Sequence, residues 1–210
     1  MNRLINSTLI TLIEDLLKEE NLILSDRKKE LLTLAKLCNS TLKEDNQLKF
    51  NVICTHNSRR SQLGQLWLRT AAVFFNINNV YTYSGGTEAT AFNINMVNAI
   101  QSVGFQIEQL NNFENPKYQI QLSEFDNDKT LYYSKIYDES YNPQANYIAI
   151  LVCNSAAETC PNVTGAKHRF VLPYNDPKTF DETNLEKKAY IDTVNEIGRE
   201  VLFMMNQIKK

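Results

Sequence analysis

The stretch VICTHNSRRS, residues 52–61, decides the fold expected for this 210-residue chain. An apolar run, residues 50–53, ends at Cys54, and five residues separate that cysteine from Arg60. The residues that follow, 62–75, carry the apolar spacing of a helix. A strand, a tight loop and a helix start in this order predict a loop whose backbone N–H groups converge on one centre and bind an anion.

The residue types in this loop predict nucleophilic chemistry as well as anion binding. Arg60 carries a guanidinium that can donate two N–H groups to one tetrahedral oxyanion. Cys54 lies in the same positive field, which favours the thiolate, the form of cysteine that attacks. We also expect Ser61 to cap the helix. The alternative is that Cys54 is a buried thiol at a strand end and Arg60 a surface charge, since free cysteine is commonly buried.

The pattern C-x5-R-S after an apolar strand resembles the phosphate loop of two families that share a fold, low-molecular-weight protein tyrosine phosphatases and thioredoxin-coupled arsenate reductases. In both, Asn57 and Ser61 match positions that hold the loop backbone and tune the thiolate. The resemblance implies that every residue after the cysteine contributes to an oxyanion cradle. These are Thr55, His56, Asn57, Ser58, Arg59, Arg60 and Ser61.

A second pair of thiols begins with Cys153, the last residue of the apolar stretch 147–153. Cys153 and Cys160 stand seven residues apart, and Pro161 comes next, as in the reductases. Seven residues of helix rise about 10.5 Å, whereas a disulfide needs Cα atoms roughly 4.4–6.8 Å apart. The two thiols can therefore bond only if the segment between them is a loop or opens into one. Two unrelated buried thiols are the alternative, and the spacing does not fit a zinc site, so we expect no metal.

The third match is Asp176-Pro177, which alone is a common turn pair. Both families place Asp-Pro on a loop over the cradle, and the resemblance gives Asp176 the role of general acid. It also implies a relay in which Cys54 attacks arsenate, Cys153 attacks the sulfur of Cys54, and Cys160 moves the disulfide outward.

The remaining sequence predicts an α/β fold, a doubly wound three-layer parallel sheet like that of the low-molecular-weight phosphatases. We expect an N-terminal helical extension over 1–48, an α/β domain over 49–210 and an inserted β-hairpin near 116–133. Ligands of such sheets bind at the carboxyl ends of strands. The further expected elements are strands at 79–84 and 169–172, helices at 91–103, 134–141 and 181–208, and a helix start signal at Ser25-Asp26.

The resemblance covers residues 49–208 by motif, and four positions depart from it. His56 and Arg59 replace small residues or a cysteine, which adds charge beside the cradle. Gln65 stands where the reductases often carry a glutamate that helps to bind potassium, so that ion is in doubt. Lys178-Thr179 follows Asp-Pro where the phosphatases show aromatic residues, which weakens the case for a tyrosine phosphatase.

The composition limits which binding partners and which cellular compartment we expect. The net charge of −2 gives no reason to expect nucleic acid or an anionic membrane. With four cysteines in a chain long enough for a real core, we expect a reduced cytoplasmic protein, with Cys38 a structural thiol on a helix stripe. No tightly bound cofactor is expected, and a thioredoxin-like protein is the expected reductant. The apolar stripes of the first two helices pack either on the main domain or on a second copy, as a homodimer.

The preferred interpretation is therefore an arsenate reductase with a disulfide relay. The first alternative is a low-molecular-weight phosphatase that hydrolyses phosphate monoesters through a phosphocysteine. The second is an oxyanion or redox sensor without catalysis.

Overall fold

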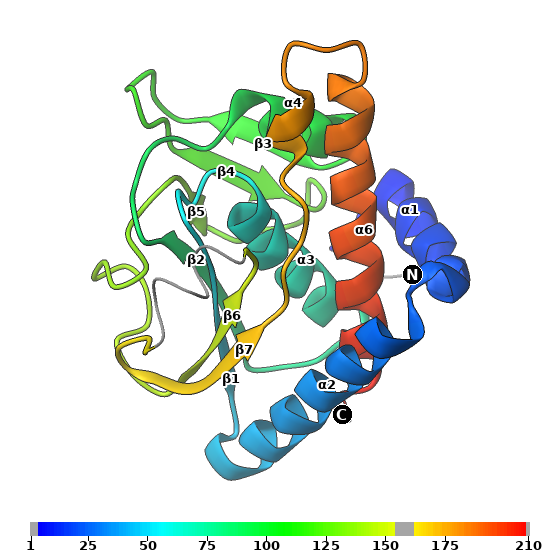
Figure 1. The fold of residues 1–210 in the computed structure, drawn as a ribbon, viewed down its shortest axis with the longest axis vertical. Helices are drawn as coiled ribbons and strands as arrows, with labels where there is room; N and C mark the ends of the chain where they lie inside the picture. The colour runs from blue at the N-terminus through cyan, green and yellow to red at the C-terminus, as the bar shows by residue number, and fades with distance from the viewer. Residues whose placement is uncertain (1–3, 154–161, 209–210) are drawn as a thin grey trace.

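The central element is a four-stranded parallel sheet (Figure 1). The computed structural model describes residues 4–153 and 162–208. The strand order is β2-β1-β6-β7. The bounds are Leu48–Cys54 for β1, Val80–Gly86 for β2, Tyr147–Leu151 for β6 and Ala166–Val171 for β7. Because β1 and β6 pair directly, Cys54 and Cys153 leave the sheet side by side. The expected α/β class is confirmed.

The two middle strands are buried on both faces, which explains their continuous apolar runs. On β1, Phe50 and Val52 join the large core shared with the helices. Ile53 points to the opposite face and joins a smaller cluster with Ala149 and Leu151 of β6. This burial fixes the register of the strands, because a slip by one residue would exchange the two faces.

Helix α3, Arg60–Phe74, starts directly from the loop after β1 and packs against the long C-terminal helix α6, Glu186–Asn206. The approach of these helices is close: a Cβ added at Gly198 would lie 2.5 Å from the ring of Trp67. The indole N–H of Trp67 donates to the carbonyl of Val194 at 2.9 Å. Helix α4, Ile94–Ser102, also packs against α6. The expected start of α6 at 181 was too early by five residues.

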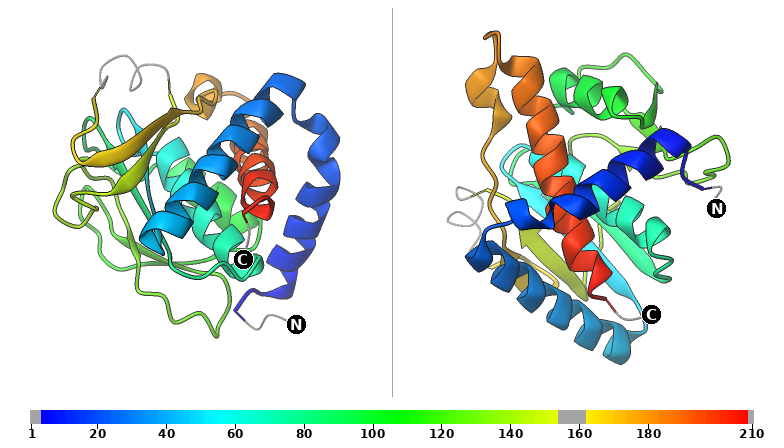
Figure 2. Two further views of the ribbon diagram at one scale, coloured as in Figure 1. Left: turned by 90° about the horizontal axis from the view of Figure 1, so that it is seen from below. Right: turned by 90° about the vertical axis from the view of Figure 1, so that its right-hand side faces the viewer.

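The N-terminal residues form helix α1, Ser7–Lys18, a short 3₁₀ turn η1, Glu19–Leu22, and helix α2, Ser25–Asp45. Figure 2 shows both helices packed across α6, and their buried side chains belong to the same core as the sheet. Cys38 is fully buried on this stripe, and burial raises the pKa of its thiol. Helix α2 starts at Ser25, as expected from Ser25-Asp26, but its N-cap residue Leu24 makes no capping hydrogen bond through its side chain.

The expected hairpin is present as part of a three-stranded antiparallel sheet. Strands β4, Tyr118–Gln121, and β5, Leu131–Tyr132, form the hairpin, and β3, Gln106–Gln109, pairs on the other side of β4. The helix expected over 134–141 was wrong, because this segment forms turns. Its backbone groups bond to other elements: the N–H of Lys135 donates to Asn57 Oδ1, and its carbonyl accepts from the N–H of Gly86.

Within the described residues, the helices are too short or too polar for any of them to cross a membrane.

Candidate active site

The loop after β1 folds back around the sulfur of Cys54. The backbone N–H of Asn57 donates to Cys54 Sγ at 3.2 Å, and Ser61 Oγ lies 3.0 Å from the same sulfur. Asn57 Nδ2 donates to Ser61 Oγ at 2.8 Å, so the serine hydrogen is left to point at the sulfur. Hydrogen bonds donated to sulfur stabilise a negative charge there. Ser61 thus serves the thiol and does not cap α3, whose preceding residue Arg59 makes no side-chain cap.

Asn57 holds the loop in a conformation that few residues adopt. Its φ is 47°, in the left-handed region that asparagine tolerates. Its side-chain oxygen accepts from the backbone N–H of Lys135 at 3.0 Å and from Gln62 Nε2 at 3.1 Å. The contacts of Lys135 and Gln62 were missed by sequence reasoning, and no local motif signals them.

Strand β2 presses its last residue against the loop. A Cβ on Gly86 would lie 2.6 Å from the carbonyl oxygen of Thr55 and 2.8 Å from the nitrogen of Asn57. Just after the strand, the N–H groups of Thr87 and Glu88 donate to the carbonyls of Cys54 and Thr55 at 3.1 and 2.8 Å. The glycine is therefore required by the close approach of backbone to backbone.

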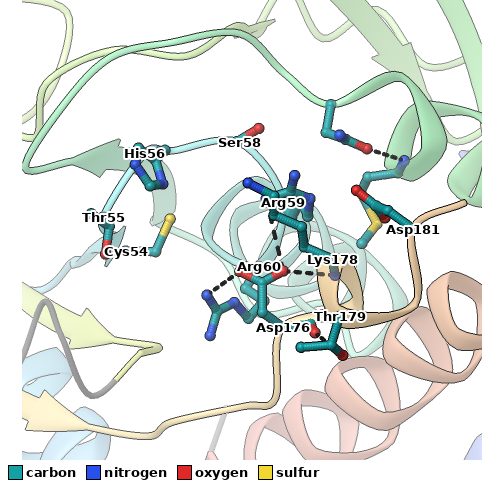
Figure 3. A network of polar contacts seen from close by, with 12 residues as sticks. Cys54, Thr55, His56, Ser58, Arg59, Arg60, Asp176, Lys178, Thr179 and Asp181 are labelled. Atoms are coloured by element: carbon teal, nitrogen blue, oxygen red, sulfur yellow. Dashed lines mark hydrogen bonds and ion pairs between the residues drawn. The ribbon is translucent and has the colours of Figure 1, made fainter.

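Two arginines and one carboxylate gather beside this loop, as Figure 3 shows. Arg60 Nη2 lies 2.5 Å from Asp176 Oδ2, and its Nη1 donates to the carbonyl of Tyr174 at 2.7 Å. Arg59 Nη1 is 3.8 Å from Asp176 Oδ1. Asp176 also caps the 3₁₀ turn η2, Pro177–Phe180, by accepting the N–H of Lys178. The sequence-predicted cation and acid are thus in direct contact.

Cys153 lies beside the start of the same loop. Its Sγ is 3.5 Å from Thr55 Oγ1, and Thr55 directly follows Cys54. Both Cys54 and Cys153 are buried. The structure therefore brings Cys54, Arg60, Asp176 and Cys153 to one edge of the sheet. Cys160, the remaining predicted thiol, lies outside the described residues.

The other loop residues have partners outside the cradle. His56 Nε2 lies 3.5 Å from Glu88 Oε2, with the imidazole about half exposed. Ser58 Oγ donates to the carbonyl of Ala91 at 2.7 Å. Arg59 Nε donates to the hydroxyl of Tyr190 at 3.1 Å, and burial together with a hydrogen bond to Asp181 raises the pKa of Tyr190 to about 12.

Gln65 stands where the reductases often carry a cation-binding glutamate, and its neutral side-chain amide is bonded to other groups of the protein. Gln65 is fully buried, donates from Nε2 to the carbonyl of Thr82 at 3.1 Å, and accepts from Ser84 Oγ at 2.6 Å. In residues 4–153 and 162–208, no group of three or more His, Cys, Asp or Glu side chains could hold a metal ion.

A buried lysine lies next to the loop, and sequence reasoning missed it. The Lys135 side chain is almost fully buried, with Nζ 3.3 Å from the carbonyl of Tyr133 and 4.5 Å from the centre of that residue's ring. Burial lowers the pKa of this amine to about 8, against the smaller opposing effect of Glu139.

Known proteins share both the sequence and the fold of this chain, although no family model matches it. The arsenate reductase of Halalkalibacterium halodurans is 27% identical over 150 residues, which cover 71% of this chain and 88% of that relative. A solved arsenate reductase in a phosphate-binding state is 15% identical with a TM-score of 0.51, covering 78% of this chain and 100% of its own. A low-molecular-weight phosphotyrosine phosphatase from Vibrio cholerae O395 is 14% identical with a TM-score of 0.51, covering 76% and 95%. The chain is thus similar in sequence to curated arsenate reductases, and it shares the fold of low-molecular-weight protein tyrosine phosphatases and arsenate reductases.

Proposed function

We propose that this chain is a thiol-dependent arsenate reductase, which converts arsenate to arsenite. The observation that carries the proposal is the thiol of Cys153, 3.5 Å from Thr55 Oγ1 at the edge of the oxyanion loop. A hydrolase needs a nucleophile, a cradle and an acid, but its reaction does not use a second cysteine at this place. The curated relatives named arsenate reductase support the same choice.

In the first step, arsenate lies among the N–H groups of residues 55–60 and the guanidinium of Arg60. The thiolate of Cys54 attacks arsenic, forming an S–As bond while one As–O bond breaks. Asp176 supplies the proton that lets the departing oxygen leave as water, which is the usual service of a general acid. Arsenic is still in its +5 state after this step.

In the second step, the thiolate of Cys153 attacks the sulfur of Cys54. A Cys54–Cys153 disulfide forms, the S–As bond breaks, and its electron pair stays on arsenic. Arsenic is thereby reduced to +3 and leaves as arsenite, while the two thiols supply the two electrons. The step needs only an accessible sulfur and one thiolate.

In the third step, Cys160 attacks Cys153, which frees Cys54 and leaves a Cys153–Cys160 disulfide. A thioredoxin-like protein then supplies two electrons and restores the thiols. The role of Cys160 follows from the resemblance of Cys153, Cys160 and Pro161 to the motif of the reductases. The proposal includes a cytoplasmic location, where thiols stay reduced, and no tightly bound cofactor.

The deciding experiment compares wild type with Cys153→Ser in two assays, arsenite formation with a thioredoxin system and hydrolysis of an aryl phosphate. We expect the variant to stop after at most one arsenate per chain, while any phosphate hydrolysis stays within about threefold of wild type, since that reaction uses no exchange step. Cys38→Ala removes a thiol from the helical core and should retain both activities. Continuous arsenite formation by Cys153→Ser would refute the relay.

The second candidate is a low-molecular-weight phosphatase. It is favoured by one observation: Cys54, Arg60 and Asp176 form a complete set for phosphate ester cleavage without Cys153. Wild-type protein that hydrolyses aryl phosphate and forms no arsenite would establish this alternative. Protein that shows neither activity, yet changes its association state when an oxyanion is added, would favour a sensor. Sedimentation of the wild type tests the predicted homodimer.

A further inference from the structure

Arg27, in the first turn of α2, reaches from the N-terminal helical pair to the loop that follows β7. Its Nη2 donates to the carbonyl of Pro173 at 2.7 Å, and its guanidinium carbon lies 4.7 Å from the ring centre of Tyr174. Its Nε donates to Glu200 Oε2 of α6 at 2.9 Å. The side chain is only 15% exposed. One guanidinium therefore holds a loop carbonyl, an aromatic ring and a buried carboxylate together.

Arginine is suited to this position by its planar fork. Glu200 is almost fully buried, and a buried carboxylate requires a charged partner. Once Glu200 binds Nε, the rigid guanidinium directs Nη2 toward Pro173, while its face stacks on Tyr174. A lysine ammonium carries a similar charge but cannot hold all three groups in this geometry.

Tyr174 connects Arg27 to the reacting groups. Its backbone N–H donates to the carbonyl of Val152 at 3.1 Å, and Val152 directly precedes Cys153. Its own carbonyl accepts Nη1 of Arg60 at 2.7 Å. Two residues later, Asp176 binds the other terminal nitrogen of Arg60. A displacement of Tyr174 would therefore move the cradle arginine and the general acid together.

We infer that Arg27 is a positioning residue: the N-terminal helical pair holds residues 173–176 in place and so orients Arg60 and Asp176 toward the oxyanion. The inference rests on the proposed function to the extent that Arg60 binds and Asp176 protonates the substrate. The N-terminal helices are then a working part of the site, although none of their residues belongs to the loop that follows Cys54.

The test uses full-length Arg27→Ala and Arg27→Lys. Inorganic phosphate serves as the probe of binding by calorimetry, and aryl phosphates with leaving groups of different basicity serve as the probe of turnover. We expect Arg27→Ala to weaken phosphate binding and to lower kcat by about tenfold to a hundredfold, since small misplacements of reacting groups cost this much. The loss should grow with the basicity of the leaving group, because a misplaced acid matters most there. Arg27→Lys should lie between Arg27→Ala and wild type.

Glu19→Gln provides the matched control. It removes another ion pair between the N-terminal segment and α6, from Glu19 Oε2 to Arg199 Nη1 at 2.8 Å, without touching residues 173–176. Binding and turnover in Glu19→Gln should stay within about twofold of wild type, as for most surface changes. The inference fails if this control loses as much as Arg27→Ala, or if Arg27→Ala loses nothing. If Arg27→Ala does not fold at the assay temperature, Arg27→Lys decides by the same two measurements.

The outcomes separate the inference from the proposed function. If wild type turns over substrate and Arg27→Ala equals it in phosphate binding and turnover, only the inference fails. Wild type that binds phosphate but neither reduces arsenate nor hydrolyses aryl phosphate removes the proposed function, and weaker phosphate binding by Arg27→Ala then still supports the inference. Wild type that neither turns over substrate nor binds phosphate removes both.

Discussion

Two loops meet at the carboxyl edge of the sheet, and they are held in opposite ways. The loop after β1 is fixed around its sulfur by close neighbours, since Asn57 and Ser61 lie three and seven residues from Cys54. The loop after β7 is fixed by partners 146 and 114 residues away, Arg27 at Pro173 and Arg60 at Tyr174. The contacts to the sulfur are thus encoded in one short motif, although Lys135 and the end of β2 also support the loop. The position of the acid, in contrast, depends on distant segments.

The largest expected effect tests whether the first loop is complete in itself. Cys54→Ser should lower turnover of arsenate and of aryl phosphate by at least about ten-thousandfold, because the nucleophile is lost. Phosphate binding, measured by calorimetry, should survive, since the serine leaves the N–H groups of the loop in place. Loss of phosphate binding would show that the sulfur also holds the loop together.

The next effect concerns the second loop. Asp176→Asn should lower kcat for aryl phosphates by about a hundredfold to a thousandfold, the usual contribution of a positioned acid. An unchanged kcat would mean that Asp176 only pairs with Arg60 and protonates nothing.

A smaller effect probes the contact between β2 and the first loop. Gly86→Ala would place a Cβ against the backbone of Thr55 and Asn57 and should weaken phosphate binding by about tenfold or more. Gly64→Ala is a matched control, because the nearest atoms to its Cβ would be those of the Val52 side chain, at 2.9 Å, and not backbone of the loop. Phosphate binding should therefore be normal in Gly64→Ala. Equal binding by both variants would show that the loop accommodates the intruding atom.

The smallest expected effect concerns Lys135, which supports the first loop through its backbone. The pKa of its amine is about 8 in the folded state and near 10.5 when exposed, so the unfolded chain binds the proton between these values. The free energy of unfolding should therefore rise with pH from about 8 to 10.5, by at most about 1.4 kcal/mol per pH unit from this group.

Lys135→Met should remove this rise, as urea unfolding at several pH values would measure. Other groups that titrate in this range contribute equally to both proteins, so the difference between them isolates the lysine. A difference that stays constant from pH 7 to pH 10 would contradict the burial of a titrating amine.

The comparison of the two loops also explains what could be predicted from the sequence. The strand, the cysteine, the arginine and the following helix lie in one stretch, so local patterns were enough for the first loop and for the parallel sheet. The helix expected over 134–141 failed because its backbone bonds to Asn57 and Gly86, which no local pattern reveals. The roles of Arg27 and Lys135 depend on contacts formed only in the folded chain.

The ion pair between Arg60 and Asp176 has a consequence for substrate affinity. A dianion that enters the loop must share or displace a carboxylate already bound to the guanidinium, so the protein contains its own competing ligand. The measured affinity of any oxyanion then includes the work of opening this pair, and the carboxylate released by the incoming guest becomes free to turn toward it. Binding of the oxyanion to Arg60 and release of the Asp176 carboxylate from Arg60 would then occur in the same exchange of partners.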